Sequence, residues 1–263
     1  MKYSVEGKDN KTLLIFITGA CVSKWMWKYQ KTLSNQYKCI YFDLPGHGEN
    51  SDIRFTTIDD VCISIIDIIK RESLDGKAII VGHSIGAQIV LKMLESYDKH
   101  VFKAIAISGL NFPMKRLMLF IKPMLSISMP LIKMKWFAKL QSKAFYLPSE
   151  LFEQYYLDSL KISFETLINI MKENMSFDFN TIVRGIPTII LNGEKEIGIM
   201  RKSAIKSHKN IKGSKYFVLK NAAHGIPYEK SDLLNSIITN FIENKKQEFN
   251  DIVDNDTLSA NSN

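Results

Sequence analysis

Short runs of consecutive apolar residues recur along both the first half and the last third of the chain. Each run is rich in β-branched residues, does not alternate with polar residues, and leads into glycine, proline, serine or asparagine. Such runs are typical of strands that are buried on both faces of a sheet. We expect strands at Leu13–Thr18, Lys38–Asp43, Ala78–Val81, Val101–Ile107, Ile186–Leu191 and Tyr216–Leu219.

Segments with apolar residues at helical spacing lie between these runs. Helices are expected at Ile58–Arg71, Ile85–Tyr97 and Ser231–Glu243. Regular alternation of strand and helix predicts the α/β fold class, with a mostly parallel sheet that helices cover on both faces. Residues that carry a function then belong at the carboxyl ends of the strands.

The interval from residue 110 to residue 180 breaks this alternation, because it holds no convincing central strand. It is dense in Met, Leu, Phe and Tyr, and prolines interrupt it. A structureless loop of this length is improbable inside a domain, so we expect an inserted helical cap. Within it, Ile132, Trp136 and Leu140 recur every fourth residue, which predicts an amphipathic helix with one apolar face.

The predicted organisation therefore has three parts. Residues 1–109 and 181–243 form the core, and residues 110–180 form the helical cap. After residue 243 the composition shifts to Asn, Asp, Ser, Lys and Gln, which is typical of a polar, disordered tail over residues 244–263.

Charge adds a second feature to this picture. The 263 residues carry a formal net charge of +8, and only five of the 35 basic residues are arginine. A nucleic-acid reader more often uses arginine forks, so we expect no nucleic acid partner. Residues 114–143 and 201–220 each hold seven basic residues and no acidic one. Either these are solvated lysine-rich faces, or they attract an acidic partner or make transient contact with an anionic membrane.

Cysteine usage and the N-terminal residues indicate the cellular compartment. Cys21, Cys39 and Cys62 form no CxxC pair and no Cys/His cluster, so neither a disulfide framework nor a metal site is predicted. Met1–Glu6 lack the apolar run of a signal peptide, and no segment approaches the ~18 apolar residues of a membrane span. A soluble, cytoplasmic protein is the expectation.

The strongest chemical signal is Gly82-His83-Ser84-Ile85-Gly86, a G-x-S-x-G motif between an expected strand and an expected helix. A sharp turn at this junction lifts Ser84 clear of the sheet, and the glycines let the backbone cross closely. The amides at the helix N-terminus favour a developing oxyanion. We interpret Ser84 as an activated nucleophile; the alternative is a tight turn in which Ser84 only caps the helix.

A serine nucleophile needs a base, and His224 is the candidate among five histidines. It follows the last expected strand and precedes the last expected helix, where an imidazole reaches a neighbouring nucleophile. His83 is expected to point away from the site into packing, and His47 to have a structural role. A carboxylate must orient the imidazole. Glu194 and Glu196 both lie in the loop after Ile186–Leu191, and we favour Glu196.

The chain order Ser84, Glu196, His224, with the G-x-S-x-G turn and the inserted helices, resembles the α/β-hydrolase superfamily in its single-domain branch with a helical cap. The resemblance covers roughly residues 11–243. Thr18-Gly19-Ala20-Cys21 is similar to the oxyanion loop of that family, although Thr18 stands where a His is usual. Asp43-Leu44-Pro45-Gly46-His47-Gly48-Glu49-Asn50-Ser51 looks like its D-x-P-G-x-G-x-S turn. The resemblance implies that the backbone amides of Ala20 and Ile85 form the oxyanion hole.

The expected function is hydrolysis of a carboxylic ester, thioester or lactone through an acyl-enzyme, with no cofactor and no metal. The epoxide and halide hydrolases of the superfamily are expected to carry a carboxylate at the position of Ser84. The cap is rich in apolar side chains, among them Met118, Trp136 and Phe137. We expect these three to bind a hydrophobic acyl part; the alternative is that they form only the core of the cap. The alternatives are an acyltransferase or a C–C bond hydrolase on the same triad, or a catalytically weak ligand-binding protein.

Overall fold

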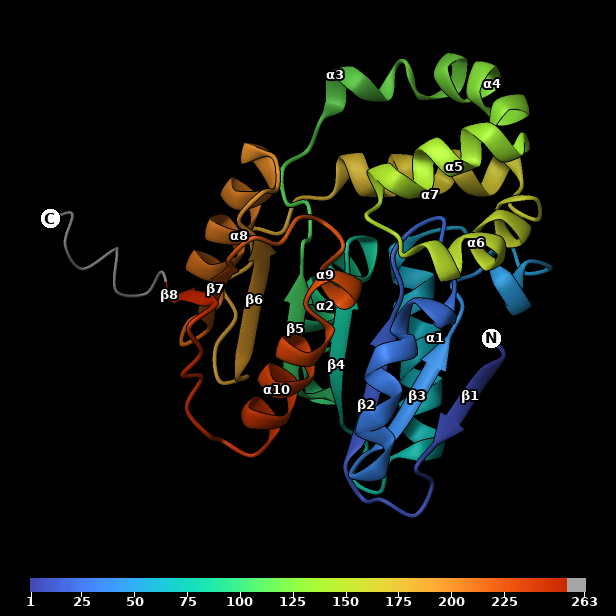
Figure 1. Ribbon diagram of the computed structural model, residues 1–263. Helices are drawn as coiled ribbons and strands as arrows, with labels where there is room; N and C mark the ends of the chain where they lie inside the picture. Colours follow the sequence, from blue (N-terminus) through green and yellow to red (C-terminus); the bar gives the residue numbers. More distant parts are fainter. Residues whose placement is uncertain (255–263) are drawn as a thin grey trace, which may run out of the picture.

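The described part of the chain, residues 1–254 apart from the side chains of residues 115 and 254, forms one eight-stranded sheet in the computed structural model (Figure 1). The strand order is β1-β3-β2-β4-β5-β6-β7-β8. The edge strands β1 and β8 pair antiparallel with their neighbours, and the strands between them are parallel. The strands are β1 Tyr3–Glu6, β2 Leu13–Ile17, β3 Lys38–Phe42, β4 Ala78–His83, β5 Val101–Ile107, β6 Thr188–Gly193, β7 Lys215–Leu219 and β8 Ile252–Asp254.

Helices pack on both faces of this sheet. Successive residues of a strand enter different buried clusters, so that Ile15 of β2 lies with residues of α1 and α2, whereas Phe16 lies with Trp27 and residues of α10. These two clusters confirm the α/β class, with a mostly parallel sheet between helical layers. The helices of the core are the 3-10 helix η1 Lys24–Asn35, α1 Ile58–Glu72, α2 Ile85–Ser96, α8 Gly198–Asn210, α9 Ile226–Glu229 and α10 Ser231–Ile242, with short 3-10 turns η2 Gly48–Asn50 and η3 Asp98–His100.

Helix α1 shows how the sequence sets these elements. The Thr57 hydroxyl accepts a hydrogen bond from the Asp60 amide at 3.1 Å and caps the first turn. Acidic residues in the first turn and Lys70 and Arg71 in the last turn complement the helix dipole. The apolar face expected from the spacing is buried, and it consists of Val61, Ile65, Ile68 and Ile69.

Between β5 and β6 the described chain forms five α-helices, which lie beyond the carboxyl ends of the parallel strands (Figure 1). We call this segment the helical insertion. Its domain boundaries at residues 110 and 180 stay a prediction. The helices are α3 Lys115–Met118, α4 Ile121–Ile132, α5 Lys135–Ala144, α6 Phe152–Ser159 and α7 Phe164–Ser176, with a 3-10 turn η4 Ser149–Leu151 before α6.

The amphipathic helix expected from Ile132, Trp136 and Leu140 does not form as one element. Ile132 ends α4, and Met134 has extended backbone angles that separate α4 from α5. The spacing of four residues therefore does not continue through one helix. Within α5 the apolar pair faces outward, because Trp136 and Leu140 are each 60% exposed. The buried residues of α5 are the small side chains Ala138 and Ser142.

Two edge strands differ from the expectation. Tyr3–Glu6 forms β1, which is half-buried along its length and lacks the continuous apolar run by which buried strands are found. The tail expected from residue 244 is not wholly unstructured, because Ile252–Asp254 pairs antiparallel with β7. Backbone pairing, which a polar composition does not prevent, holds this segment. The rest of the expected tail, residues 255–263, lies outside the described residues.

Two further properties of residues 1–254 bear on function. No helix in this range is long and apolar enough to cross a membrane. The same range contains no group of three or more His, Cys, Asp or Glu side chains arranged to hold a metal ion.

Candidate active site

Ser84 occupies a strained turn between β4 and α2. Its backbone has φ 58° and ψ −118°, a conformation that L-residues rarely adopt, and its amide donates to the Ile107 carbonyl at 2.9 Å. Two glycines permit this turn. A Cβ on Gly82 would lie 2.1 Å from the Gly86 carbonyl oxygen, and a Cβ on Gly86 would lie 2.4 Å from the Ile17 carbonyl oxygen. The Ser84 hydroxyl therefore stands on a rigid support at the carboxyl edge of the sheet.

An imidazole and a carboxylate meet at the ends of two neighbouring strands. His224 follows β7, Glu196 follows β6, and His224 Nδ1 lies 2.6 Å from Glu196 Oε1. The Glu196 side chain is only 2% exposed, and its Oε2 accepts hydrogen bonds from the Ser108 hydroxyl at 3.1 Å and the Gly193 amide at 3.0 Å. A carboxylate held in this way keeps the proton of His224 on Nδ1 and leaves Nε2 able to accept one.

Glu194, the other carboxylate considered for this position, has a different partner. Its Oε2 accepts a hydrogen bond from the Asn221 amide at 2.9 Å, where it stabilises the turn after β7. Of the two glutamates in the loop after β6, the structure thus brings Glu196 to His224.

His83 joins the loop of His224 to the turn of Ser84. His83 Nε2 lies 2.7 Å from the His224 carbonyl oxygen, and the ring centroids of the two histidines are 4.8 Å apart. This side chain was expected only to pack, and the sequence holds no signal for its bridging contact. Burial, together with the neighbouring His224, lowers the pKa of His83 to about 3, so it is neutral and donates from Nε2.

The loop after β2 runs beside the nucleophile. A Cβ on Gly19 would lie 3.5 Å from the Ser84 Cβ, which places the following residue, Ala20, at the edge of the same site. Neither the Ala20 amide nor the Ile85 amide donates a hydrogen bond within the described part of the chain. Both donors are thus available, as the oxyanion role requires. That role, which the family resemblance implied, stays a prediction.

His47 supports this loop from the turn after β3. His47 Nε2 accepts the Cys21 amide at 3.0 Å, and Nδ1 lies 3.0 Å from the Pro45 carbonyl oxygen, to which it donates. Burial lowers the pKa of His47, which keeps Nε2 free to accept. The Thr18 hydroxyl is buried and makes no hydrogen bond among the described residues. Loop support therefore comes from His47 rather than from Thr18.

Asp43 ties the same turn to η1. Its Oδ1 accepts the Lys24 amide at 2.6 Å and its Oδ2 accepts the Glu49 amide at 2.8 Å. Burial raises the pKa of Asp43, although these amide contacts oppose the rise. The D-x-P-G-x-G-x-S stretch thus shapes the loops around the site rather than supplying a reacting group.

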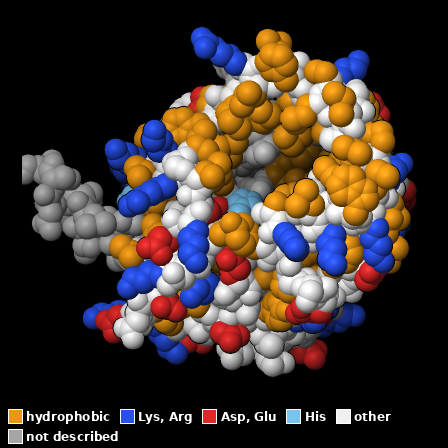
Figure 2. Space-filling view, turned by 45° about the horizontal axis from the view of Figure 1, so that its top comes forward, with side chains coloured by type: hydrophobic (Ala, Val, Ile, Leu, Met, Phe, Trp, Pro, Cys, Tyr) orange, Lys and Arg blue, Asp and Glu red, His pale blue; other side chains and the backbone are white. Residues whose placement is uncertain are grey.

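The helical insertion packs against both sides of this site. On one side, Cys21 lies in an apolar cluster with Met118 of α3. On the other side, Tyr146 packs closely on Gly225, the residue after His224, because a Cβ added to Gly225 would lie 2.7 Å from the Tyr146 Cβ. Figure 2 shows a hollow in the face formed by the insertion, with a histidine side chain at its floor and hydrophobic side chains around its mouth.

The three residues predicted to bind substrate all lie in the insertion. Met118 is half-buried, and Trp136 and Phe137 of α5 contact each other edge to face, with ring centroids 5.6 Å apart. Trp136 is mostly exposed. Contact of these side chains with a substrate stays a prediction. The Cys21 thiol does not add a reactive group, because burial raises its pKa to about 11.

Known proteins resemble this chain in sequence and in structure. The model of the family described as alpha/beta hydrolase fold matches residues 12–172. Epoxide hydrolase 1 of Caenorhabditis elegans is 29% identical over 109 residues, which are 40% of this chain and 27% of that protein. A Haemophilus influenzae protein described as a putative 2-succinyl-6-hydroxy-2,4-cyclohexadiene-1-carboxylate synthase is 28% identical over 106 residues, 39% of this chain and 42% of that protein. This chain thus matches less than half of the length of either relative.

The similarity of folds extends further than the similarity of sequences. The structure of an esterase from Exiguobacterium antarcticum superimposes with a TM-score of 0.76 over 92% of this chain and 94% of that one. Its identity to this chain is 19%, so this likeness shows the fold alone.

Proposed function

Because this chain belongs to the alpha/beta hydrolase fold family, we propose that it is a serine hydrolase that cleaves a carboxylic ester, thioester or lactone with a hydrophobic acyl part. One observation carries the proposal. The buried Glu196 carboxylate hydrogen-bonds His224 Nδ1 at 2.6 Å, beside the strained turn that presents Ser84. These are the three functions, namely nucleophile, base and orienting acid, that acyl transfer requires.

The proposed reaction has two steps. His224 Nε2 takes the proton of the Ser84 hydroxyl as the oxygen attacks the carbonyl carbon, and the amides of Ala20 and Ile85 stabilise the oxyanion. His224 then gives the proton to the leaving oxygen or sulfur, which departs and leaves an acyl-enzyme on Ser84. Water, deprotonated by His224, attacks the acyl carbon and restores the serine. The Glu196 carboxylate keeps its hydrogen bond to His224 Nδ1 and stabilises the imidazolium formed in each step.

A serine at position 84 separates this proposal from the activity in the name of the Caenorhabditis elegans relative. An epoxide hydrolase of this superfamily is expected to carry a carboxylate residue in the turn that corresponds to the one after β4, where this chain has Ser84. A hydroxyl activated by an adjacent imidazole suits acyl transfer. We therefore favour an acyl substrate over an epoxide.

The preference for a hydrophobic acyl part rests on the insertion. The hollow in Figure 2 has mainly hydrophobic side chains around its mouth, and Met118 belongs to the apolar cluster that reaches Cys21 beside Ala20. Nitrophenyl esters of increasing acyl length, from acetyl to decanoyl, measure this preference. We expect kcat/KM to rise with chain length; maximal efficiency on the acetyl ester contradicts a hydrophobic acyl site.

Covalent labelling tests the chemistry directly. A fluorophosphonate should label the wild type and fail to label Ser84→Ala, while circular dichroism shows both to be folded. Glu196→Gln should lower kcat by a factor on the order of 10⁴, because the amide disturbs the imidazole tautomer. Glu194→Gln is the matched control and should keep nearly full activity, since Glu194 contacts the Asn221 amide instead. Equal losses in the two glutamine variants would contradict the assignment.

A further inference from the structure

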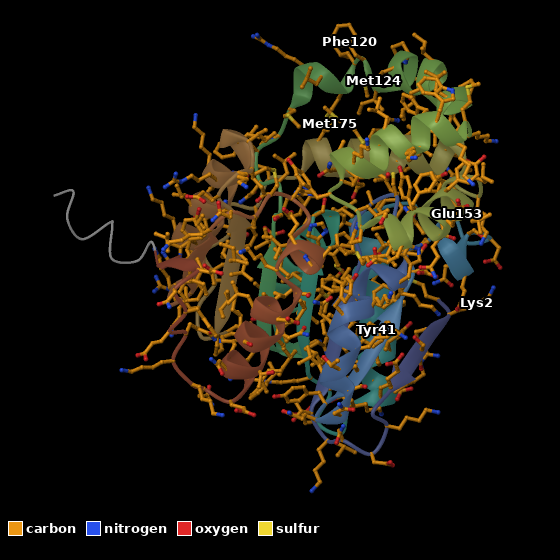
Figure 3. The ribbon with its side chains drawn as sticks, viewed as in Figure 1. Lys2, Tyr41, Phe120, Met124, Glu153 and Met175 are labelled. Atoms are coloured by element: carbon orange, nitrogen blue, oxygen red, sulfur yellow. The ribbon has the colours of Figure 1, made fainter. Side chains whose placement is uncertain are left out.

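The outer face of the helical insertion exposes large apolar side chains. Their exposed fractions run from 51% to 79%, which leaves most of each side chain in water. Figure 2 shows hydrophobic side chains gathered on this side of the molecule around the hollow. Figure 3 shows Phe120 at the outer edge of the helical insertion. We call this surface the apolar outer face; it consists of Leu117, Leu119, Phe120, Met124, Ile127, Trp136 and Leu140.

The helices of the insertion are turned so that this face has no partner within the described chain. Helix α4 buries Ile121 and Leu125 against the α7 side and leaves Ile127 73% exposed. Helix α5 buries Ala138 and Ser142. Helices of a globular protein normally bury their large apolar residues, whereas α5 exposes Trp136 and Leu140, and α4 exposes Met124 and Ile127 in addition to the apolar residues that it buries. Large apolar side chains exposed together on two neighbouring helices are typical of an interaction surface.

The sequence segment that carries this surface has charges of one sign. Residues 114–143 hold seven basic residues and no acidic one. Lys122, Lys139 and Lys143 are exposed, and none of them forms an ion pair among residues 1–254. Lys135 does form one, with Glu153 of α6 at 2.7 Å. Free ammonium groups therefore lie among the apolar side chains of α4 and α5.

From these two properties we propose that the apolar outer face binds the surface of an anionic lipid bilayer. Exposed apolar side chains insert into the boundary between headgroups and acyl chains, while lysines bind anionic headgroups. A second copy of this chain fits the same face poorly, because a two-fold contact would bring the unpaired lysines of α4 and α5 against the same lysines of the other copy. The face complements an anionic, apolar partner, and a bilayer is both.

The position of the hollow gives this contact a consequence. The hollow opens within the same face of the molecule (Figure 2), so docking turns its mouth toward the lipid. An ester dissolved in the bilayer then reaches the hollow without crossing water. The binding itself does not depend on the proposed hydrolysis, and it is measured with the Ser84→Ala variant.

Sedimentation with vesicles tests the proposal. Ser84→Ala protein should sediment with vesicles of phosphatidylcholine and phosphatidylserine, and much less with phosphatidylcholine alone. Combining Lys122→Gln with Lys139→Gln should weaken binding to the anionic vesicles roughly 25-fold, at about 5-fold per lysine. Lys8→Gln combined with Lys11→Gln is the matched control, because these lysines lie in the β1–β2 loop at the opposite end of the sheet (Figure 1). The control should change binding less than 2-fold, because the attraction between lysines and anionic headgroups is screened over this distance.

The apolar contribution has its own variants. Phe120→Ser should weaken vesicle binding, whereas Leu74→Ser, which changes an 89% exposed residue of the α1–β4 loop, should not. Trp136 is the only mostly exposed tryptophan of three, so its emission should shift to the blue with vesicles, and Trp136→Phe should remove that shift. Absence of binding to anionic vesicles, or equal losses in the two lysine pairs, overturns the proposal. A dimer that Phe120→Ser dissociates also overturns it, by identifying a second copy as the occupant.

Discussion

His83 couples the protonation state of the site to the stability of the fold. Its Nε2 donates to the His224 carbonyl oxygen at 2.7 Å, and its Nδ1 is buried with no hydrogen-bond partner among the described residues. A proton on Nδ1 would therefore meet no acceptor. This burial, with His224 beside it, lowers the pKa of His83 to about 3 from the ordinary value of 6.5.

The direction of the pH effect follows from these two values. Between about pH 6.5 and pH 3 the unfolded chain binds a proton at His83 and the folded chain does not. The contribution of His83 to stability is thus fully present above pH 6.5 and is lost as the pH falls through this window. From about pH 7 to about pH 4, the unfolding free energy should decrease by about 3 kcal/mol through this one group.

Urea unfolding of the wild type and His83→Gln, at a series of pH values, measures this quantity. Glutamine can still donate to the His224 carbonyl oxygen, but it does not titrate. At about pH 7 the variant should be somewhat less stable, because its fit differs. The difference should shift by about 3 kcal/mol in favour of the variant by about pH 4. If both proteins lose stability in parallel over this range, with equal m-values, the reasoning about the buried imidazole is wrong.

Three further substitutions test supporting contacts. Ser108→Ala removes the hydroxyl that donates to Glu196 at 3.1 Å, so kcat/KM for a nitrophenyl ester should fall about tenfold; an unchanged value contradicts this role. His47→Leu removes the acceptor of the Cys21 amide, so fluorophosphonate labelling of folded protein should slow about tenfold. Lys103→Met removes three hydrogen bonds from a buried ammonium to the end of α10, and urea unfolding should show a loss of about 2–3 kcal/mol rather than a few tenths.

The core strands were predictable because they lie inside the sheet. A strand buried on both faces is apolar at most positions, and β2, β3, β5 and β7 lie within one residue of their expected bounds. The edge strands β1 and β8 have one neighbour each and do not need such runs. Their pairing depends on backbone hydrogen bonds to β3 and β7, and side-chain pattern does not report those.

The candidate site was predictable as far as its residues follow strands. Ser84, Glu196 and His224 come directly after or near the ends of three parallel strands, and such ends meet at one edge of a sheet. The links between them were not predictable. His83 bridges to a carbonyl 141 positions away, and Ser108 reaches Glu196 across 88 positions. A contact to a backbone carbonyl leaves no trace in residue type, and a serine after a strand has many possible partners.

The helical insertion shows a different limit of prediction from sequence, which concerns the spacing of apolar residues. A stripe of large apolar residues establishes that a helix has two unlike faces, but it does not establish which face meets the protein. In α5 the side chains that pack inward are Ala138 and Ser142, and a pair this small lets the helix lie close to its neighbours. Trp136 and Leu140 are then left outside, on a helix whose Lys139 and Lys143 form no ion pair within residues 1–254. Exposure of this much apolar surface costs solubility unless something covers it. The residues for which the prediction of one amphipathic helix was wrong are therefore the ones on which we base the proposed contact with a bilayer.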